Sequence, residues 1–247
     1  MKLLAVDCST DACSVALLLG DACLVEHVVA ERQHAGLVLD MAARLLTESG
    51  TSLTALDGIA FGQGPGSFTG LRIAAGVTQG LAFGADLAVI GVSSLAALAQ
   101  HTHEEHGAGH VAAAFDARMG EVYFGLYAFG ADGLMSAVGE DTVCAPQDVK
   151  LVQAPGAGWT GAGTGWSAHG QVLRERLGAT LDAVHADLHP HAGALARLGA
   201  VRLQAGEGLP AAGALPVYLR DKVAERPRRL DGSQFEQAGA REHPGTR

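Results

Sequence analysis

Apolar residues near the start of the chain cluster in short runs. Residues 3–6 and 14–19 are apolar runs separated by the polar stretch DCSTDA, and residues 24–30 are rich in β-branched and apolar side chains. Short runs of this kind, bounded by turn residues, are typical of β-strands. The pattern predicts three consecutive strands, the first two joined by a turn that contains Asp7.

The next segment has the spacing of an amphipathic helix. Over residues 33–49 the apolar side chains fall three and four positions apart, at Val38, Met41, Ala42, Leu45 and Leu46. This spacing places them on one face of a helix, with the polar side chains on the other.

Strand and helix then alternate. We predict a buried strand at 56–64, a helix of small residues at 70–83, a strand at 87–92 and a helix at 93–102. The polar segment HTHEEHGAGH interrupts this pattern, and we interpret it as an exposed connector between two lobes.

The pattern restarts after the connector. The stretch HVAAAFDARMGEVYFGLYAF predicts a strand, a turn at Asp116 and a second strand, and residues 159–177 predict a glycine turn that enters a helix. Because both halves open with strand, Asp-containing turn and strand, we expect a duplicated α/β unit. The predicted lobes are residues 1–106 and 107–224, the last segment packing back on the first lobe, followed by a polar tail at 225–247 that lacks periodicity.

Composition narrows the possible functions. The chain has 247 residues, 48% of them hydrophobic, and a formal net charge of −9. An acidic protein is poorly suited to gripping nucleic acid by itself, because phosphate binding normally needs a basic patch. The chain starts directly with a predicted strand, contains no apolar run of membrane-spanning length, and its cysteines lack metal or disulfide spacing. We therefore expect a cytoplasmic protein.

The stretch GQGPGSFTGLR at 62–72 raises the question of a nucleotide site. A phosphate-binding P-loop needs a lysine after its glycines, and none follows here. The dinucleotide-binding pattern has Thr69 where its third glycine should stand, and the register around Ser67 does not match a hydrolase nucleophile turn. None of the three nucleotide or nucleophile motifs fits.

The helix behind this loop carries a regular stripe of glycines, at Gly76, Gly80 and Gly84. Each glycine inside a helix costs about 1 kcal/mol relative to alanine, which indicates a compensating close approach of another backbone. A partner helix could supply that approach, and so could the protein's own sheet. Arg72 stands in the first turn, where the helix dipole disfavours a cation, so we expect it to meet a partner or form an ion pair.

Three motifs resemble the TsaB (YeaZ) family: GPGSFTGLRIAAG at 64–76, DARMGEVYFGLY at 116–127 and PVYLRDKVA at 216–224. The resemblance covers residues 1–224. It implies a two-lobed fold of the actin, Hsp70 and sugar-kinase superfamily. It also implies a subunit of the bacterial machinery that makes threonylcarbamoyladenosine (t6A) in tRNA, paired with the similar catalytic subunit TsaD through helices of the first lobe.

The resemblance implies a docking surface on two helices of the first lobe. The first helix would contribute Leu37, Met41 and Leu45. The second would contribute Arg72, Ile73, Gly76, Val77 and Gly80. The same surface would pair two copies of the chain when the partner is missing. A TsaE-like ATPase subunit is a further candidate partner, and tRNA would be met only through the complex.

Departures from the catalytic relatives argue for a non-catalytic subunit. TsaD-like chains carry two metal-binding histidines on the helix after the strand at 87–92, where this chain has Ser94 and Leu98, and leucine cannot ligate a metal. We therefore predict no catalytic residue, no metal and no cofactor. The candidates for a vestigial nucleotide cleft are Asp7, Asp116, Gly161 and Gly163, since the phosphate-binding turns lack their usual small residues.

Rival interpretations remain for these residues. Asp7 and Asp116 could hold magnesium in an autonomous ATPase or kinase of the same superfamily, or they could simply form turns. A peptidase is a weaker alternative, because no supporting catalytic triad is visible. The histidines of the polar segment, His101, His103, His106 and His110, could bind a metal, although glycines separate the last two.

Overall fold

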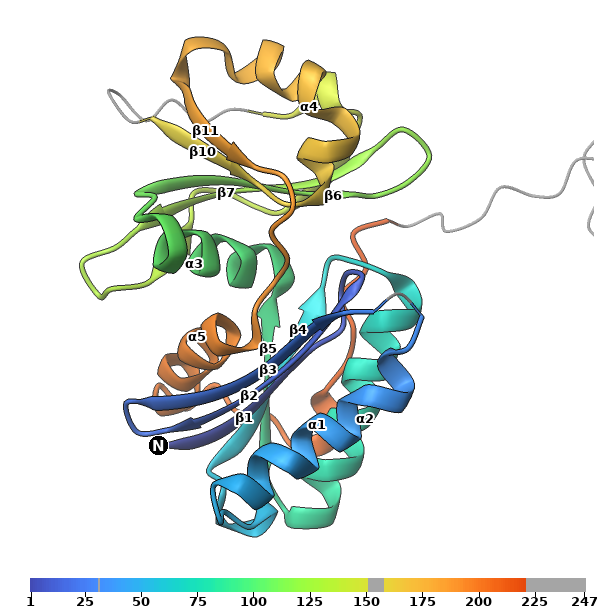
Figure 1. The fold of residues 1–247 in the computed structure, drawn as a ribbon, viewed down its shortest axis with the longest axis vertical. Coiled ribbons are helices and arrows are strands. Elements are labelled where there is room, and N and C mark those ends of the chain that lie inside the picture. The colour runs from blue at the N-terminus through green and yellow to red at the C-terminus, as the bar shows by residue number, and fades with distance from the viewer. Residues whose placement is uncertain (31, 151–157, 221–247) are drawn as a thin grey trace, which may run out of the picture.

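The computed structural model describes residues 1–30, 32–150 and 158–220, and they form two lobes, each built on its own β-sheet (Figure 1). The predicted tail at 225–247 and the end of the motif at 216–224 fall largely outside the described residues. Two mixed sheets with flanking helices confirm the predicted duplicated α/β fold. Whether the lobes are separate folding domains, divided at 106/107, stays a prediction.

The first sheet has five strands in the order β3-β2-β1-β4-β5. They are β1 (Lys2–Asp7), β2 (Ala12–Leu19), β3 (Ala22–Val29), β4 (Gly58–Gly64) and β5 (Ala88–Ser93). β1, β2 and β3 pair antiparallel, whereas β4 and β5 continue the sheet in parallel. The central strands are buried on both faces, which is why their sequences are almost continuously apolar.

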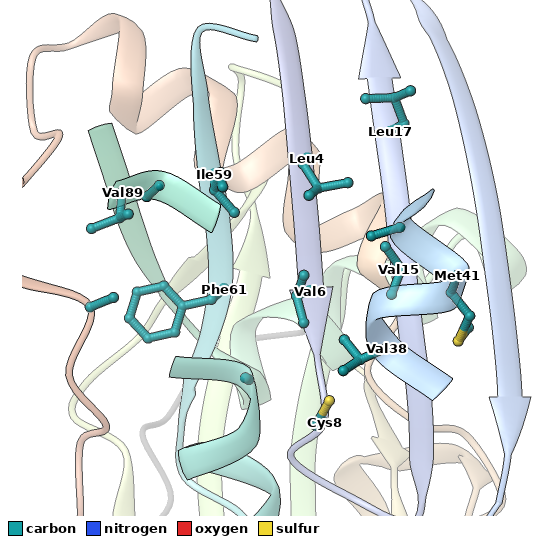
Figure 2. Packing of buried hydrophobic residues seen from close by; sticks show 14 of the residues in the cluster. Leu4, Val6, Cys8, Val15, Leu17, Val38, Met41, Ile59, Phe61 and Val89 are labelled. Atoms are coloured by element: carbon teal, nitrogen blue, oxygen red, sulfur yellow. The ribbon is translucent and has the colours of Figure 1, made fainter. Parts of the chain in front are cut away.

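Helices cover both faces of this sheet. On one face α1 (His34–Glu48) and α2 (Phe68–Ala85) lie side by side, and on the other lies α5 (Ala192–Gln204) (Figure 1). Figure 2 shows Val38 and Met41 of α1 among Val6, Val15 and Leu17 of the strands. This packing follows from the helical spacing of the apolar residues in α1.

The second sheet has six strands, in the order β11-β10-β6-β7-β8 with β9 also paired to β7. They are β6 (His110–Asp116), β7 (Val122–Phe129), β8 (Met135–Ala137), β9 (Thr142–Cys144), β10 (Trp159–Ala162) and β11 (Leu181–His185). Helix α4 (Thr164–Leu177) packs on one face and α3 (Ser94–His106) on the other. Short 3-10 turns occur at Leu53–Ala55, Pro146–Asp148, Gly178–Thr180 and Ala211–Gly213.

The prediction of an exposed connector at 101–110 is wrong over its first half. Residues 101–106 are the last turns of α3, which ends where Gly107 takes a left-handed conformation and its N–H bonds the carbonyl of His103. One of its polar side chains contacts α5, since Glu104 forms an ion pair with Arg197 at 2.6 Å. The polar run therefore begins as the last turns of a helix and becomes a connector only after Gly107.

The chain returns to the first lobe after β11. Helix α5 packs on the first sheet, and the following segment runs along α2. Gln79 donates to the carbonyl of Ala214 at 2.9 Å, and the N–H of Val217 donates to the carbonyl of Gln63 at 2.7 Å. Among the described residues, no helix combines the length and apolar character that crossing a bilayer requires.

Candidate docking face and interlobe cleft

The glycines of the 62–72 loop shape a close contact between α2 and the β1–β2 turn. An added Cβ at Gly70 would overlap the carbonyl oxygen of Cys8, and one at Gly66 would overlap that of Ser9. The hydroxyl of Ser67 caps α2 by accepting a hydrogen bond from the N–H of Gly70. Backbone contact between two elements of this chain therefore accounts for these first glycines.

The later glycines of α2 have the opposite environment. Gly76, Gly80 and Gly84 are exposed, and an added Cβ at any of them meets nothing within 4 Å. The helix packs on its own sheet through a different face, which includes Ala74 and Ala82. The alternative that the glycine stripe serves packing on the protein's own sheet is therefore wrong.

Two of the predicted docking residues are not available at the surface. Met41 and Leu45 are each only 2% exposed and belong to the core between α1 and the first sheet. The apolar spacing used to choose them is the signature of the face that packs on the sheet, so a partner can meet only the opposite face of α1. Leu37 is half-buried against the same core.

The exposed face instead presents residues that the sequence analysis missed. Leu39 of α1 is 49% exposed and Phe83 of α2 is 85% exposed. On α2, Ile73 and Val77 are half-buried while Arg72 is exposed. The sequence signal for Phe83 is a large aromatic residue on the face of α2 that carries the glycines. We call the exposed side of α2 formed by Gly76, Gly80, Phe83 and Gly84, which share one helix face by their spacing, the docking face.

Arg72 stands at the start of the same helix and is held from two sides. Its guanidinium carbon lies 3.8 Å from the centre of the Phe68 ring, a favourable cation–π arrangement, and its Nε donates to the hydroxyl of Tyr218 at 3.1 Å. No carboxylate lies within 4 Å of it in the part of the chain that the structure describes. The positive charge is thus oriented but not paired.

The segment that holds Arg72 also reaches the second lobe. Two residues after Tyr218, Arg220 forms an ion pair with Glu121 and contacts the sulfur of Met119 at 3.5 Å. One short segment thus connects the turn between β6 and β7 with the first turn of α2. This explains physically why the PVYLR motif accompanies the glycine helix.

A cleft of about 870 Å³ lies between the lobes. The first lobe lines it with the β1–β2 turn and the start of α2, and the second lobe with the β6–β7 turn and the start of α4. Asp116 lines this cleft, where its carboxylate accepts from the guanidinium of Arg118 at 3.0 Å and lies 3.7 Å from the imidazole of His169. Arg118 and Met119 both have positive φ, which places them in a tight turn at the cleft.

Asp7 does not line the cleft with Asp116. Its side chain is 1% exposed and accepts hydrogen bonds from the backbone and hydroxyl of Ser9, at 2.9 and 2.7 Å, and from the hydroxyl of Ser94 at 3.5 Å. Burial raises the pKa of Asp7 to about 6, although the bonds from Ser9 oppose this. The alternative in which Asp7 and Asp116 form a carboxylate pair across the cleft is therefore wrong, and the turn-forming alternative describes Asp7 better.

The remaining nucleotide-cleft candidates also have packing roles. Gly161 lies against the ring of Trp166, leaving no room for a Cβ, and a Cβ at Gly163 would lie 2.5 Å from the carbonyl oxygen of Ala114. Neither lines the cleft. Leu98, which the resemblance predicts to stand where TsaD-like chains carry a histidine, is fully buried in a hydrophobic cluster.

The raised pKa of Asp7 predicts a pH-dependent stability. The folded state binds this proton more tightly than the unfolded state, whose pKa is near 3.8, so the contribution of Asp7 to stability is full below pH 4 and is lost as pH rises through 6. The loss is at most about 3 kcal/mol. Urea unfolding at pH 4 to 7 measures this loss of stability. In the Asp7→Asn variant the part of the pH dependence that comes from Asp7 should disappear. The control Asp40→Asn, which changes an exposed acid, should keep it. Parallel stability curves for wild type and Asp7→Asn would contradict the assignment.

Comparison with known proteins places the chain among a set of tRNA-modification proteins. The sequence model of the family described as TsaD, tRNA N6-adenosine threonylcarbamoyltransferase, matches residues 27–227. The tRNA threonylcarbamoyladenosine biosynthesis protein TsaB of Escherichia coli is 40% identical over 91% of this chain and 96% of its own length. The protein of the same name from Haemophilus influenzae is also 40% identical, over 90% of this chain and 95% of its own.

A solved structure agrees with these relatives. YeaZ from Pseudomonas aeruginosa superposes with a TM-score of 0.82 and is 49% identical, covering 88% of this chain and 99% of its own. The range matched by the family model, residues 27–227, spans both lobes and the positions of the three motifs.

Proposed function

The chain belongs to the TsaB (YeaZ) family, and from this membership we propose that it is a non-catalytic subunit required for t6A modification of tRNA. In this proposal it binds a TsaD-like catalytic subunit and supports its action. It works in the cytoplasm, needs no cofactor of its own and meets tRNA only within the complex. A TsaE-like ATPase is a further candidate member of that complex.

The docking face carries the proposal. Gly76, Gly80 and Gly84 leave the backbone of α2 uncovered along one side, next to the exposed ring of Phe83. Three helix glycines are costly without compensation, and an exposed apolar patch beside them is typical of an interaction surface. A second helix lying along the stripe would bury both features at once.

The expected partner is a protein of similar fold. A sequence model named for the catalytic protein matches most of this chain, so the two subunits would present related helix pairs to each other. Pairing of related surfaces across an approximate two-fold axis is common in oligomers. For the same reason, the docking face would pair two copies of this chain when the partner is absent.

The environments of Asp7 and Leu98 support the proposal that the chain is not catalytic. The first-turn carboxylate, Asp7, is buried and bonded inside the lobe, and Ser94 donates to it. Leu98 fills core space. Asp116 alone among the proposed nucleotide-cleft candidates lines the cleft, and this observation sustains the rival interpretation as an autonomous ATPase.

The proposal is tested in a bacterium depleted of its own TsaB and supplied with this chain, by measuring t6A in tRNA digests with mass spectrometry. We expect the wild-type chain to restore t6A and Asp116→Asn to restore it within about twofold, since the proposed role needs no carboxylate chemistry in the cleft. Failure of the wild-type chain would overturn the t6A role. Restoration by the wild type but loss with a folded Asp116→Asn variant would favour an activity in the cleft.

A further inference from the structure

A second, smaller cavity of about 290 Å³ lies away from the interlobe cleft. It is formed at the start of α3, between the end of β5, the strands β7 and β8, and helix α5, so both lobes contribute to it. The proposed docking function uses none of its residues. We call it the Asp141 cavity after the acid that lines it.

Asp141 is held in one orientation by two neutral donors. The hydroxyl of Tyr127 donates to its Oδ1 at 2.5 Å, and the hydroxyl of Ser93 donates to its Oδ2 at 2.6 Å. Each carboxylate oxygen can accept a further hydrogen bond. Because Tyr127 and Ser93 come from different lobes, the carboxylate stands at the junction of the two and its position is fixed before any ligand arrives.

This carboxylate has no cation of its own. No lysine, arginine or histidine nitrogen lies within 4 Å of Asp141 among the described residues. Burial raises its pKa, against the lowering effect of the two hydroxyl donors. A partly buried carboxylate without a counter-charge is costly, and a bound ammonium group would offset that cost.

A cation lines the same cavity from α5. The guanidinium of Arg202 donates from Nε to Glu207 at 2.8 Å and from its first terminal nitrogen to the carbonyl of Gly91. These bonds use two of the five N–H donors of the guanidinium, and the described residues give the other three no hydrogen-bond acceptor. A simple amine could bind only Asp141, whereas a molecule with both an ammonium and a carboxylate could bind Asp141 and Arg202 together.

The rest of the wall limits the size and polarity of a ligand. Val92, Ala96, Met135 and Leu198 supply apolar surface, and the volume is below the range of drug-sized ligand sites. A nucleotide is therefore too large, and a short aliphatic side chain suits the apolar wall.

We propose that the Asp141 cavity binds a free amino acid, with its ammonium group on Asp141 and its carboxylate on Arg202. Because the site joins Ser93 of the first lobe to Tyr127 and Asp141 of the second, an amino acid bound there also strengthens the contact between the lobes.

Ligand-observed NMR and calorimetry on the full chain test this inference. The probes are glycine, alanine, valine and leucine, each beside its methyl ester, which lacks the carboxylate charge, and its N-acetyl form, which lacks the ammonium charge. We expect at least one free amino acid to bind with a dissociation constant in the millimolar range or tighter, and both modified forms to bind at least about tenfold more weakly.

Variants locate the binding. Asp141→Asn and Arg202→Gln should each weaken binding at least about tenfold, while Glu140→Gln, which changes the neighbouring acid, should leave it unchanged. If a variant does not fold, the comparison of free, esterified and acetylated ligands on the wild-type chain still tests whether binding needs both charges of the amino acid. Binding of none of the free amino acids up to tens of millimolar, or equal binding of the modified forms, would overturn the inference while leaving the docking proposal untouched.

Discussion

Gly76→Leu is expected to abolish binding of the chain to a TsaD-like partner, raising the dissociation constant at least about 100-fold, or about 2.8 kcal/mol. The added side chain would stand on the exposed stripe of α2, where nothing of this chain lies within 4 Å of a Cβ. A helix that approaches the bare backbone would be pushed away by it. The isolated variant should fold at least as well as the wild type, because leucine is a better helix former than glycine.

The matched control is Gly170→Leu on α4, in the second lobe. A Cβ at Gly170 also meets nothing within 4 Å, so this variant makes the same substitution on a helix away from the docking face. Calorimetry with the purified partner should give wild-type affinity for the control. Equal affinity of wild type and Gly76→Leu would show that the stripe is not where the partner binds.

Gly70→Ala and Gly76→Ala are expected to change stability in opposite directions, although both glycines belong to α2. The methyl group at position 70 would overlap the carbonyl oxygen of Cys8, and a backbone atom cannot move aside cheaply. We expect a loss of about 3 kcal/mol or more in the free energy of unfolding, at the upper end of overpacking effects. At position 76 the same methyl is free, and the helix should gain about 1 kcal/mol.

Chemical denaturation of the two variants beside the wild type measures both effects in one experiment. The two variants distinguish two roles of glycine in α2. Gly70 allows a close contact within the chain at the start of the helix, and Gly76 leaves an open surface further along. Similar destabilisation by both substitutions would mean that Gly76 also packs inside the protein, and the docking face would then have to be redefined.

Much of the fold follows from local patterns. The helical spacing at 38, 41, 42 and 45 predicts α1 because those side chains do pack on the sheet, and the apolar runs around Val6 and Ile59 predict strands because both faces of the central sheet are buried. The glycine stripe of α2 is equally visible in the sequence, since its period of four matches a helix face.

The errors arise where a residue's partner lies far away in the chain. The sequence predicts Met41 and Leu45 on a partner surface, yet both side chains are buried against the sheet of this chain. The sequence leaves open whether Asp7 faces Asp116 across a cleft or forms a turn; its hydrogen bonds go to Ser9 and to Ser94, which follows 87 residues later. The local sequence does not determine in which direction a carboxylate at the end of a strand points.

The polar groups of the Asp141 cavity illustrate the same limit. Ser93 ends β5, Tyr127 lies in β7 and Asp141 precedes β9, and nothing in their spacing marks them as neighbours. Likewise, the contact of Arg72 with Tyr218 spans 146 positions. Such clusters depend on how the lobes pack, and only a structure brings them together.

The central claim is that this chain acts by binding a TsaD-like subunit through the first lobe, and size-exclusion chromatography with light scattering tests it most directly. The wild-type chain is mixed with the TsaD-like protein of the same organism, without nucleotide and with it, and the mass of the eluting species is measured. The account predicts a complex with one copy of each subunit. Two proteins that elute separately under both conditions would contradict it.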